Sequence, residues 1–216
     1  MFRDRVDAGR RLAARLAEMR GESVVVLGLP RGGVPVAAEV AVELGAPLDV
    51  IVVRKLGVPL QPEVAMGAIG EDGSRYLDQQ LIERIGISDA QIEDVERRER
   101  ATLASRVALF RARTDRIELS GRTALIVDDG IATGATSTVA CRIARDLGAA
   151  RVVLAAPVGG TDAGRRVHGA DDVVCLLQPL GFQAVGAYYR DFGQTSDAEV
   201  VALLTHARRR TGLAEE

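Results

Sequence analysis

The sequence has little of what several classes of protein need. It contains no tryptophan, two cysteines and two histidines, and Cys141, Cys175, His168 and His206 stand far apart in the chain. This spacing argues against a disulfide framework and against a zinc site. A net charge of -2 gives no electrostatic footprint for nucleic acid, no apolar run is long enough to cross a bilayer, and the first residues lack the apolar core of a signal peptide. We therefore expect a cytoplasmic protein with neither a nucleic-acid nor a membrane partner.

Lysine is also nearly absent. Of the 28 basic residues, only Lys55 is a lysine. A compact ammonium group on a flexible stem differs physically from a planar guanidinium, so a site that needs an ammonium group would resist replacement by arginine. Lys55 is therefore either a chance survival or a functional residue.

What is present indicates one folded domain over residues 1–216. Of these 216 residues, 47% are hydrophobic and 27% are charged, which is enough apolar material for one sizeable core. Short apolar runs bounded by Gly, Pro or charged residues predict buried parallel strands at 23–29, 49–53, 123–127, 151–156 and 172–176.

Stretches with helical spacing separate most of these strands, and amphipathic helices open and close the chain. The opening helix has an apolar stripe of Val6, Leu12, Leu16 and Met19, and the closing helix covers 198–209. Such alternation predicts an α/β fold: an open, mostly parallel sheet with flanking helices, whose core spans about 23–176.

Two regions interrupt this alternation. Residues 56–115 form an insertion, of which 56–78 is rich in Gly and Pro and predicts a mobile loop or hairpin. A long helix follows, with Ser88 as its N-cap and the apolar stripe Ile92, Val95, Leu103, Val107 and Phe110. The charge run at 93–100 is typical of a solvated face. The second region, 178–195, holds four of the seven aromatic residues: Phe182, Tyr188, Tyr189 and Phe192.

The segment ALIVDDGIATGAT, at 124–136, carries the strongest chemical signal. A buried parallel strand would place Asp128 and Asp129 at its carboxyl end, where open α/β sheets bind ligands. The small residues that follow would expose backbone N–H groups at a helix N-terminus and so form an anion site: Ala132, Thr133, Gly134, Ala135 and Thr136. Two carboxylates would repel a phosphate but accept hydrogen bonds from sugar hydroxyls, so a ribose 5-phosphate fits. The alternative is an ordinary strand-to-helix turn capped by Asp.

This motif resembles the signature of the type I phosphoribosyltransferases, which bind phosphoribosyl pyrophosphate (PRPP). Gly130 stands where the family has a branched residue, and Ala132 stands where the hypoxanthine and guanine enzymes have an acid/base Asp. The likeness is therefore closest to the adenine and orotate branches.

The resemblance implies roles for other segments. GLPRGGVP, at 28–35, resembles the pyrophosphate loop, with backbone N–H groups near Arg31, Gly32 and Gly33, although a tight turn would also explain it. RKLGVP, at 54–59, resembles a stretch of adenine phosphoribosyltransferases in which Arg54 and Lys55 would meet pyrophosphate. Residues 56–78 would form the mobile lid. Residues 178–195 would form a base-binding hood, and its candidate base contacts are Phe182, Val185, Tyr188 and Asp191.

The implied reaction transfers the 5-phosphoribosyl group of PRPP to a nitrogenous base and releases pyrophosphate. Its candidate catalytic residues are Asp128, Asp129, Lys55 and Glu63, the last as a possible acid/base group. Mg²⁺ would be held mainly by PRPP, and the family implies a homodimer. Two alternatives stay open: a PRPP sensor without catalysis, which the absence of Lys and Arg from 56–74 favours, and another phosphosugar enzyme, such as a nucleoside phosphorylase or a hydrolase.

Overall fold

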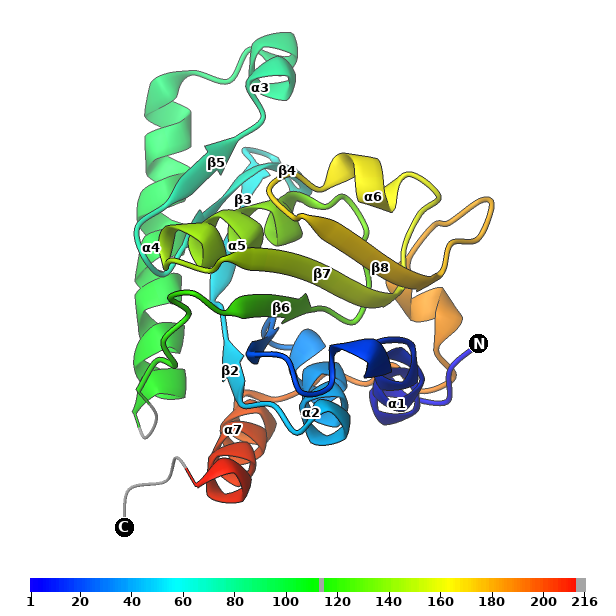
Figure 1. The fold of residues 1–216 in the computed structure, drawn as a ribbon. Helices are drawn as coiled ribbons and strands as arrows, with labels where there is room; N and C mark the ends of the chain where they lie inside the picture. Colours follow the sequence, from blue (N-terminus) through cyan, green and yellow to red (C-terminus); the bar gives the residue numbers. More distant parts are fainter. Residues whose placement is uncertain (113–114, 213–216) are drawn as a thin grey trace.

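The main sheet contains five parallel strands. The computed structural model describes residues 1–112 and 115–212, apart from the side chain of Glu63. The strands lie in the order β2-β1-β6-β7-β8, and every neighbouring pair is parallel (Figure 1). Their bounds are β1 Val24–Gly28, β2 Leu48–Val50, β6 Thr123–Val127, β7 Arg151–Val158 and β8 Asp172–Leu177. The predicted open parallel sheet is confirmed.

Helices cover both faces of this sheet. On one face lie α1 (Arg5–Arg15), α2 (Gly33–Leu44) and α7 (Asp197–Thr211), and on the other lies α5 (Ala135–Asp146) (Figure 1). Side chains along β1 alternate between the two layers: Val24 and Val26 pack with α1 and α2, whereas Val25 and Leu27 pack with α5. The short helices are η1 (Ala17–Met19), α6 (Ala163–Arg166) and η2 (Val185–Tyr188).

The opening helix differs from its prediction at one position. Leu12, Leu16 and Met19 are buried as expected, but Val6 is exposed. Asp4 caps α1 by accepting a hydrogen bond from Asp7 N, so Val6 falls in the first turn, on the solvent side of the helix.

The predicted lid is a second sheet. The strand expected at 49–53 divides, because β2 ends at Val50 and the chain continues from Val53 as β3 (Val53–Val58). This strand pairs antiparallel with β4 (Gln61–Gly70), which pairs antiparallel with β5 (Arg75–Leu77). The hairpin prediction is confirmed, but RKLGVP is mostly strand rather than loop.

The helical insertion consists of α3 (Gln79–Ile85) and α4 (Asp89–Arg111). Ser88 caps α4 in a reciprocal pair of bonds with Gln91, as its position in the sequence predicts. The apolar stripe is buried apart from Val107, which is half-buried.

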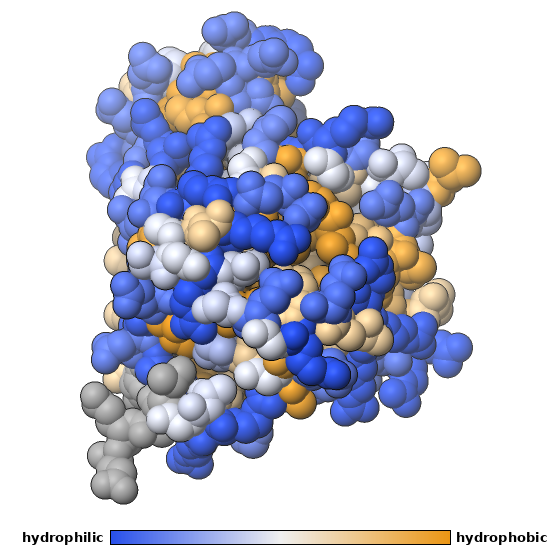
Figure 2. All heavy atoms as spheres, in the orientation of Figure 1, coloured by the Kyte–Doolittle hydropathy of each residue, from blue (hydrophilic) through white to orange (hydrophobic). Residues whose placement is uncertain are grey.

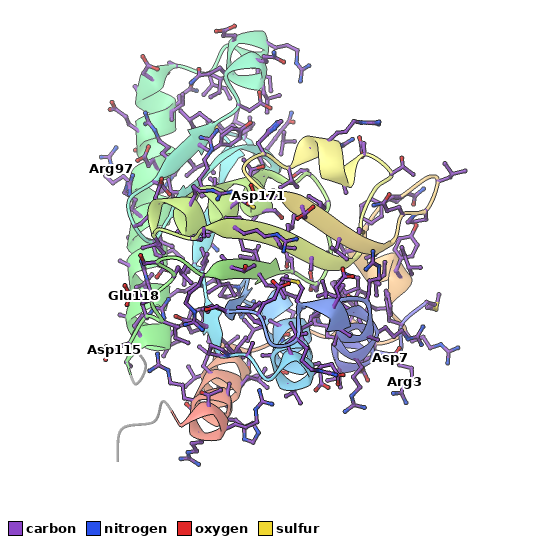
Figure 3. All side chains as sticks on the ribbon, in the orientation of Figure 1. Arg3, Asp7, Arg97, Asp115, Glu118 and Asp171 are labelled. Carbon is purple, nitrogen blue, oxygen red and sulfur yellow. The ribbon has the colours of Figure 1, made fainter. Side chains whose placement is uncertain are left out.

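The prediction of a fully solvated charge run at 93–100 is wrong in part. Arg97 projects from α4 into solvent (Figure 3), but the half-buried Glu96 accepts hydrogen bonds from Arg75 and Arg100. Glu99 pairs with Arg54 of β3. One side of the run therefore attaches α4 to the second sheet.

The surface is mostly hydrophilic on the face drawn in Figure 2. An apolar band lies in the region of β7 and β8, where the residues of β8 from Val173 onward are half-buried. Within the described ranges, no helix has both the length and the apolar character needed to span a bilayer.

Candidate functional site

Two loops leave the same edge of the main sheet. Gly28 of β1 pairs with Val127 of β6, so the loop that follows β1 lies beside Asp128 and Asp129. A Cβ atom added to Gly32 would lie 2.0 Å from Asp129 Oδ2, and one added to Gly33 would lie 3.1 Å from Asp128 Oδ1. Glycine is required here by this close approach. The structure therefore brings together the two motifs that the sequence singles out.

The loop after the aspartates ends at the start of α5 with few of its amides paired. Ile131 N donates to Val158 O, which ties the loop to β7. For the amides of 132–136, the only acceptor recorded among the described residues is Thr133 Oγ1, 3.5 Å from Ala135 N. Gly134, at a φ of 80°, is the N-cap of α5. Open amides at a helix N-terminus suit an anion, and binding of the 5-phosphate there stays a prediction.

The loop after β1 offers fewer amides than predicted. Gly33 N donates to Leu29 O at 3.0 Å, and Gly33 is buried as the first residue of α2. Its N–H is therefore not available to pyrophosphate, which corrects the prediction for this residue. Arg31 and Gly32 are half-buried, and the peptide bond between Pro30 and Arg31 is cis.

The two aspartates are unequal in their surroundings. Burial raises the pKa of Asp128 well above its ordinary value, and the neighbouring charge of Asp129 raises it further. Burial also raises the pKa of Asp129, but the Arg5 guanidinium opposes this rise. Arg5 Nε and Nη2 each lie 2.8 Å from Asp129 Oδ2. No sequence pattern marks Arg5, which lies in another helix far from the acidic motif.

Two cavities adjoin the loop at 130–134 that leads into α5. One, of about 470 Å³, lies between Ala132 and Thr133, the start of α6, and Phe182 and Gln183 of the hood. The other, of about 270 Å³, lies between the second sheet and the loop, and Thr133 lines it too.

Arg166 of α6 lines both cavities. Its Nε donates to Asp162 Oδ2 at 2.6 Å. No sequence pattern marks Arg166, because the RR pair of α6 looks like any exposed pair of charges.

The hood places its predicted base contacts at different depths. Phe182 lines the larger cavity and stacks on Tyr188, with ring centroids 5.8 Å apart and planes 9° apart. Val185 faces Gly130, where an added Cβ would lie 2.5 Å from Val185 Cγ1. The missing branched side chain at 130 is thus replaced by a side chain from the hood. Asp191 is exposed and accepts a hydrogen bond from Gly193 N. Of the four predicted base contacts, only Phe182 lines the cavity of about 470 Å³.

The second sheet separates the two basic residues of RKLGVP. Successive side chains of a strand point to opposite faces. Arg54 Nε lies 2.8 Å from Glu99 Oε2 on the α4 side. Lys55 is half-buried on the other face of β3 and lies opposite Ala68 of β4. Arg54 is therefore paired with Glu99 in this structure, and its contact with pyrophosphate stays a prediction. Glu63 belongs to β4, but its side chain lies outside the described part of the structure.

The protein groups that could bind a metal are few. In the described ranges, no three side chains of the His, Cys, Asp or Glu type gather into a metal-binding cluster. Mg²⁺ prefers oxygen ligands such as carboxylates, but two aspartates alone are too few to complete its coordination shell. The aspartate pair therefore suits a metal ion whose other ligands come from elsewhere.

Comparisons with known proteins agree with this arrangement. The sequence profile of the Phosphoribosyl transferase domain family matches residues 3–190. Over 210 residues the chain is 59% identical to a protein named "Putative phosphoribosyl transferase" in two strains of Mycobacterium tuberculosis. The alignment covers 97% of this chain and 47% of that protein, so the chain spans about half the length of the curated relatives it matches.

Solved structures show the same fold. The crystal structure of TT1426 from Thermus thermophilus matches with a TM-score of 0.81 and 43% identity, over 95% of this chain and 98% of that chain. A hypothetical protein from Neisseria gonorrhoeae, solved with bound ppGpp, matches with a TM-score of 0.51 and 12% identity, over 96% and 99% of the two chains. The family profile, together with the acidic motif at the edge of the sheet, shows that this chain belongs to the phosphoribosyl transferase domain family, of type I.

Proposed function

We propose that the protein transfers the 5-phosphoribosyl group of PRPP to a nitrogenous base and releases pyrophosphate. The observation that carries this proposal is the placement of Asp128 and Asp129 between two loops at one sheet edge, one of them a loop of open amides that starts a helix. A ribose 5-phosphate has both chemical groups that this edge can bind.

Each part of PRPP has a candidate partner in the proposal. The 5-phosphate binds the amides of 132–136, and the ribose hydroxyls donate to Asp128 and Asp129. The diphosphate lies near Arg31 and Gly32, with Lys55 as a compact cation. Positive charge develops at C1 as the diphosphate leaves, and the two carboxylates stabilise it.

The acceptor base occupies the cavity of about 470 Å³. This cavity reaches the phosphate loop at Ala132 and Thr133, and Phe182 offers an aromatic face for stacking. The acid/base group stays a proposal, and Glu63 is the candidate that the sequence offers. We also propose a homodimer, which the elution volume of the purified protein with in-line light scattering would test.

Magnesium belongs to the proposal as a partner of the diphosphate. When bound, the ion would neutralise charge on the leaving group. Asp128 is the protein carboxylate best placed to meet it through water or a ribose hydroxyl, because no arginine of the described chain forms an ion pair with Asp128.

One observation favours a PRPP sensor as the second candidate. The hairpin of β3 and β4 has no basic residue between Leu56 and Ser74, and Arg75 at the start of β5 is bound to Glu96. A lid with so little positive charge gives weak support to a leaving diphosphate. Tight binding without turnover would be the result.

Product analysis distinguishes these functions. The protein is incubated with PRPP, Mg²⁺ and a panel of purine, pyrimidine and pyridine bases. Nucleotide plus pyrophosphate supports the transferase. Tight PRPP binding without products supports the sensor, and ribose 5-phosphate plus pyrophosphate supports the hydrolase.

A further inference from the structure

Arg5 connects the first turn of α1 to the acidic edge of the sheet. Its Nε donates a hydrogen bond to Asp129 Oδ2 at 2.8 Å, and its Nη2 forms an ion pair with the same oxygen, also at 2.8 Å. Only 13% of the Arg5 side chain and 16% of the Asp129 side chain are exposed. Charge-assisted hydrogen bonds of this kind are roughly twice as strong as neutral ones, and partial burial protects them from screening by salt.

The other end of the guanidinium is held by the hood. Arg5 Nη1 donates to Gly193 O at 2.6 Å, and the guanidinium carbon lies 4.0 Å from the centre of the Phe192 ring. The remaining arginines of this region face solvent. Arg3 and Arg10 have side chains that are 65% and 64% exposed, and Figure 3 shows Arg3 pointing away from the sheet. Arg5 is the arginine of α1 that turns inward.

The backbone of Asp129 is fixed by the same part of the molecule. Tyr189 Oη donates to Asp129 O at 2.7 Å, and the Tyr189 ring packs against Phe2 and Phe192 at centroid distances of 5.4 and 5.0 Å. The backbone of Phe2 bonds to Tyr188 and Arg190. The N-terminal segment and the hood therefore meet at Asp129, although they lie far apart in the sequence.

Arg5 contacts one carboxylate oxygen of Asp129, Oδ2, and forms no hydrogen bond with the other, Oδ1. The absence of a side chain at Gly32 makes room for this contact, since a Cβ there would lie 2.0 Å from Asp129 Oδ2 and 3.2 Å from Arg5 Nε. No hydrogen bond to Asp129 Oδ1 is recorded among the described residues. Asp128 Oδ1 accepts a hydrogen bond from Asp129 N, so the two carboxylates have fixed relative positions.

We infer that Arg5 is a positioning residue for the ribose-binding pair: it holds Asp129 by Oδ2 and so presents Oδ1 to a sugar hydroxyl, at a site assembled from segments far apart in the sequence. This inference rests on the proposed binding of PRPP. The same contact opposes the rise of the Asp129 pKa that burial causes, and Asp128 beside it has no such guanidinium contact in the described part of the chain.

The test compares Arg5→Gln, Arg5→Lys and the control Arg10→Gln, which removes an exposed ion pair with Glu39 from the same helix. PRPP affinity is measured by calorimetry between about pH 5 and pH 8. Arg5→Gln is expected to weaken binding by about 10- to 100-fold, the change expected for a hydrogen bond to a charged group. The loss should grow as the pH falls, because the pKa of Asp129 rises without the guanidinium. Arg5→Lys keeps the positive charge but lacks the planar, forked donor geometry of the guanidinium. It should therefore restore the pH profile but only part of the affinity.

A purely structural role for Arg5 predicts something else. It would lower the melting temperature of Arg5→Gln while leaving the affinity of the folded protein and its pH profile unchanged, and that result would overturn the inference. Arg10→Gln should match the unmodified protein in every measurement.

A second readout needs no ligand. The carboxyl carbon of Asp129 is titrated by NMR in the free protein and in Arg5→Gln. A higher pKa in the variant supports the inference, and an unchanged pKa overturns it. If the unmodified protein fails to bind PRPP, the proposed function fails, and the titration still decides whether Arg5 controls the charge of Asp129.

Discussion

Two pairs of acids in this protein differ in burial and in their surroundings: the side chains of Asp49 and Glu71 are 2% and 1% exposed, whereas Asp129 is 16% exposed and Asp128 is half-buried. Asp49 and Glu71 lie where the main sheet passes into the second sheet. Arg111 Nη1 lies 2.5 Å from Asp49 Oδ1, and Arg111 Nη2 lies 3.4 Å from Glu71 Oε1. Arg116 Nη2 lies 3.1 Å from Glu71 Oε2. Backbone amides also donate to both carboxylates.

Asp128 and Asp129 have one arginine between them in the described part of the chain. Arg5 holds Asp129, and Asp128 accepts a hydrogen bond from the next backbone amide. A buried carboxylate without a matching cation is costly to the folded state. The contrast fits a structural role for the first pair, which connects two sheets, and the proposed ligand-binding role for the second.

The largest effect is expected from removing the arginine that pairs with both Asp49 and Glu71. Arg111→Ala leaves Asp49 and Glu71 buried with less positive charge, so the free energy of unfolding should fall by about 3–5 kcal/mol. Urea denaturation measures this loss, with Arg97→Ala on the exposed side of α4 as the control. A loss below about 1 kcal/mol would mean that the two pairs differ less than their surroundings suggest.

The second prediction concerns the space around Asp129. Gly32→Ala adds a Cβ 2.0 Å from Asp129 Oδ2, so the carboxylate or the loop must shift and the contact with Arg5 is disturbed. We expect a destabilisation of about 1–3 kcal/mol, as for other insertions into packed sites, together with weaker PRPP binding. Gly45→Ala is a poor control because Gly45 has a φ of 64°, whereas Gly164→Ala has room for a Cβ and should change neither quantity. Unchanged affinity in Gly32→Ala would show that the position of Asp129 does not matter.

The third prediction is a stability that depends on pH. The pKa of Asp128 is raised in the folded state, first by burial and then by Asp129, so the folded protein binds a proton that the unfolded chain has released. The free energy of unfolding should therefore fall as the pH rises from about 4 through the raised pKa. Asp128→Asn should flatten this slope and raise the melting temperature at neutral pH. Identical slopes for the variant and the unmodified protein would argue against an unmatched charge at Asp128.

The smallest effect is expected at Arg54. Its ion pair with Glu99 is about a quarter exposed, with side chains 27% and 26% accessible. Arg54→Gln should cost less than about 1 kcal/mol and leave PRPP affinity unchanged. A large loss of affinity would return Arg54 to the pyrophosphate site that its sequence context suggests.

The sequence predicts the main sheet well because its strands are continuous apolar runs. A parallel strand covered on both faces must be apolar at every position, and β1, β6 and β7 satisfy this rule along most of their length. The second sheet is harder to predict, since its Gly and Pro residues suggest turns, and its strands become evident only as a pair with β-bulges between Leu56 and Val58.

The acidic motif is predictable because its residues are consecutive, whereas its partners are not. Asp128 and Asp129 can be placed from one strand and one loop. Arg5, Gly193 and Tyr189 reach them from other elements, and no local pattern marks which of the many arginines turns inward. Gly33 shows the opposite case: its place in a glycine-rich loop suggests a free amide, but this amide donates to Leu29 O in the turn that precedes α2.

Calorimetric titration of PRPP in the presence of Mg²⁺ tests the central claim most directly, with the unmodified protein and the Asp128→Asn, Asp129→Asn double variant compared at equal folded fraction. We predict saturable binding to the unmodified protein and a loss of at least about 100-fold in the variant, because both acceptors for the ribose hydroxyls lose their charge. Equal affinity of the two proteins for PRPP would contradict the assignment of this sheet edge as the sugar-binding site.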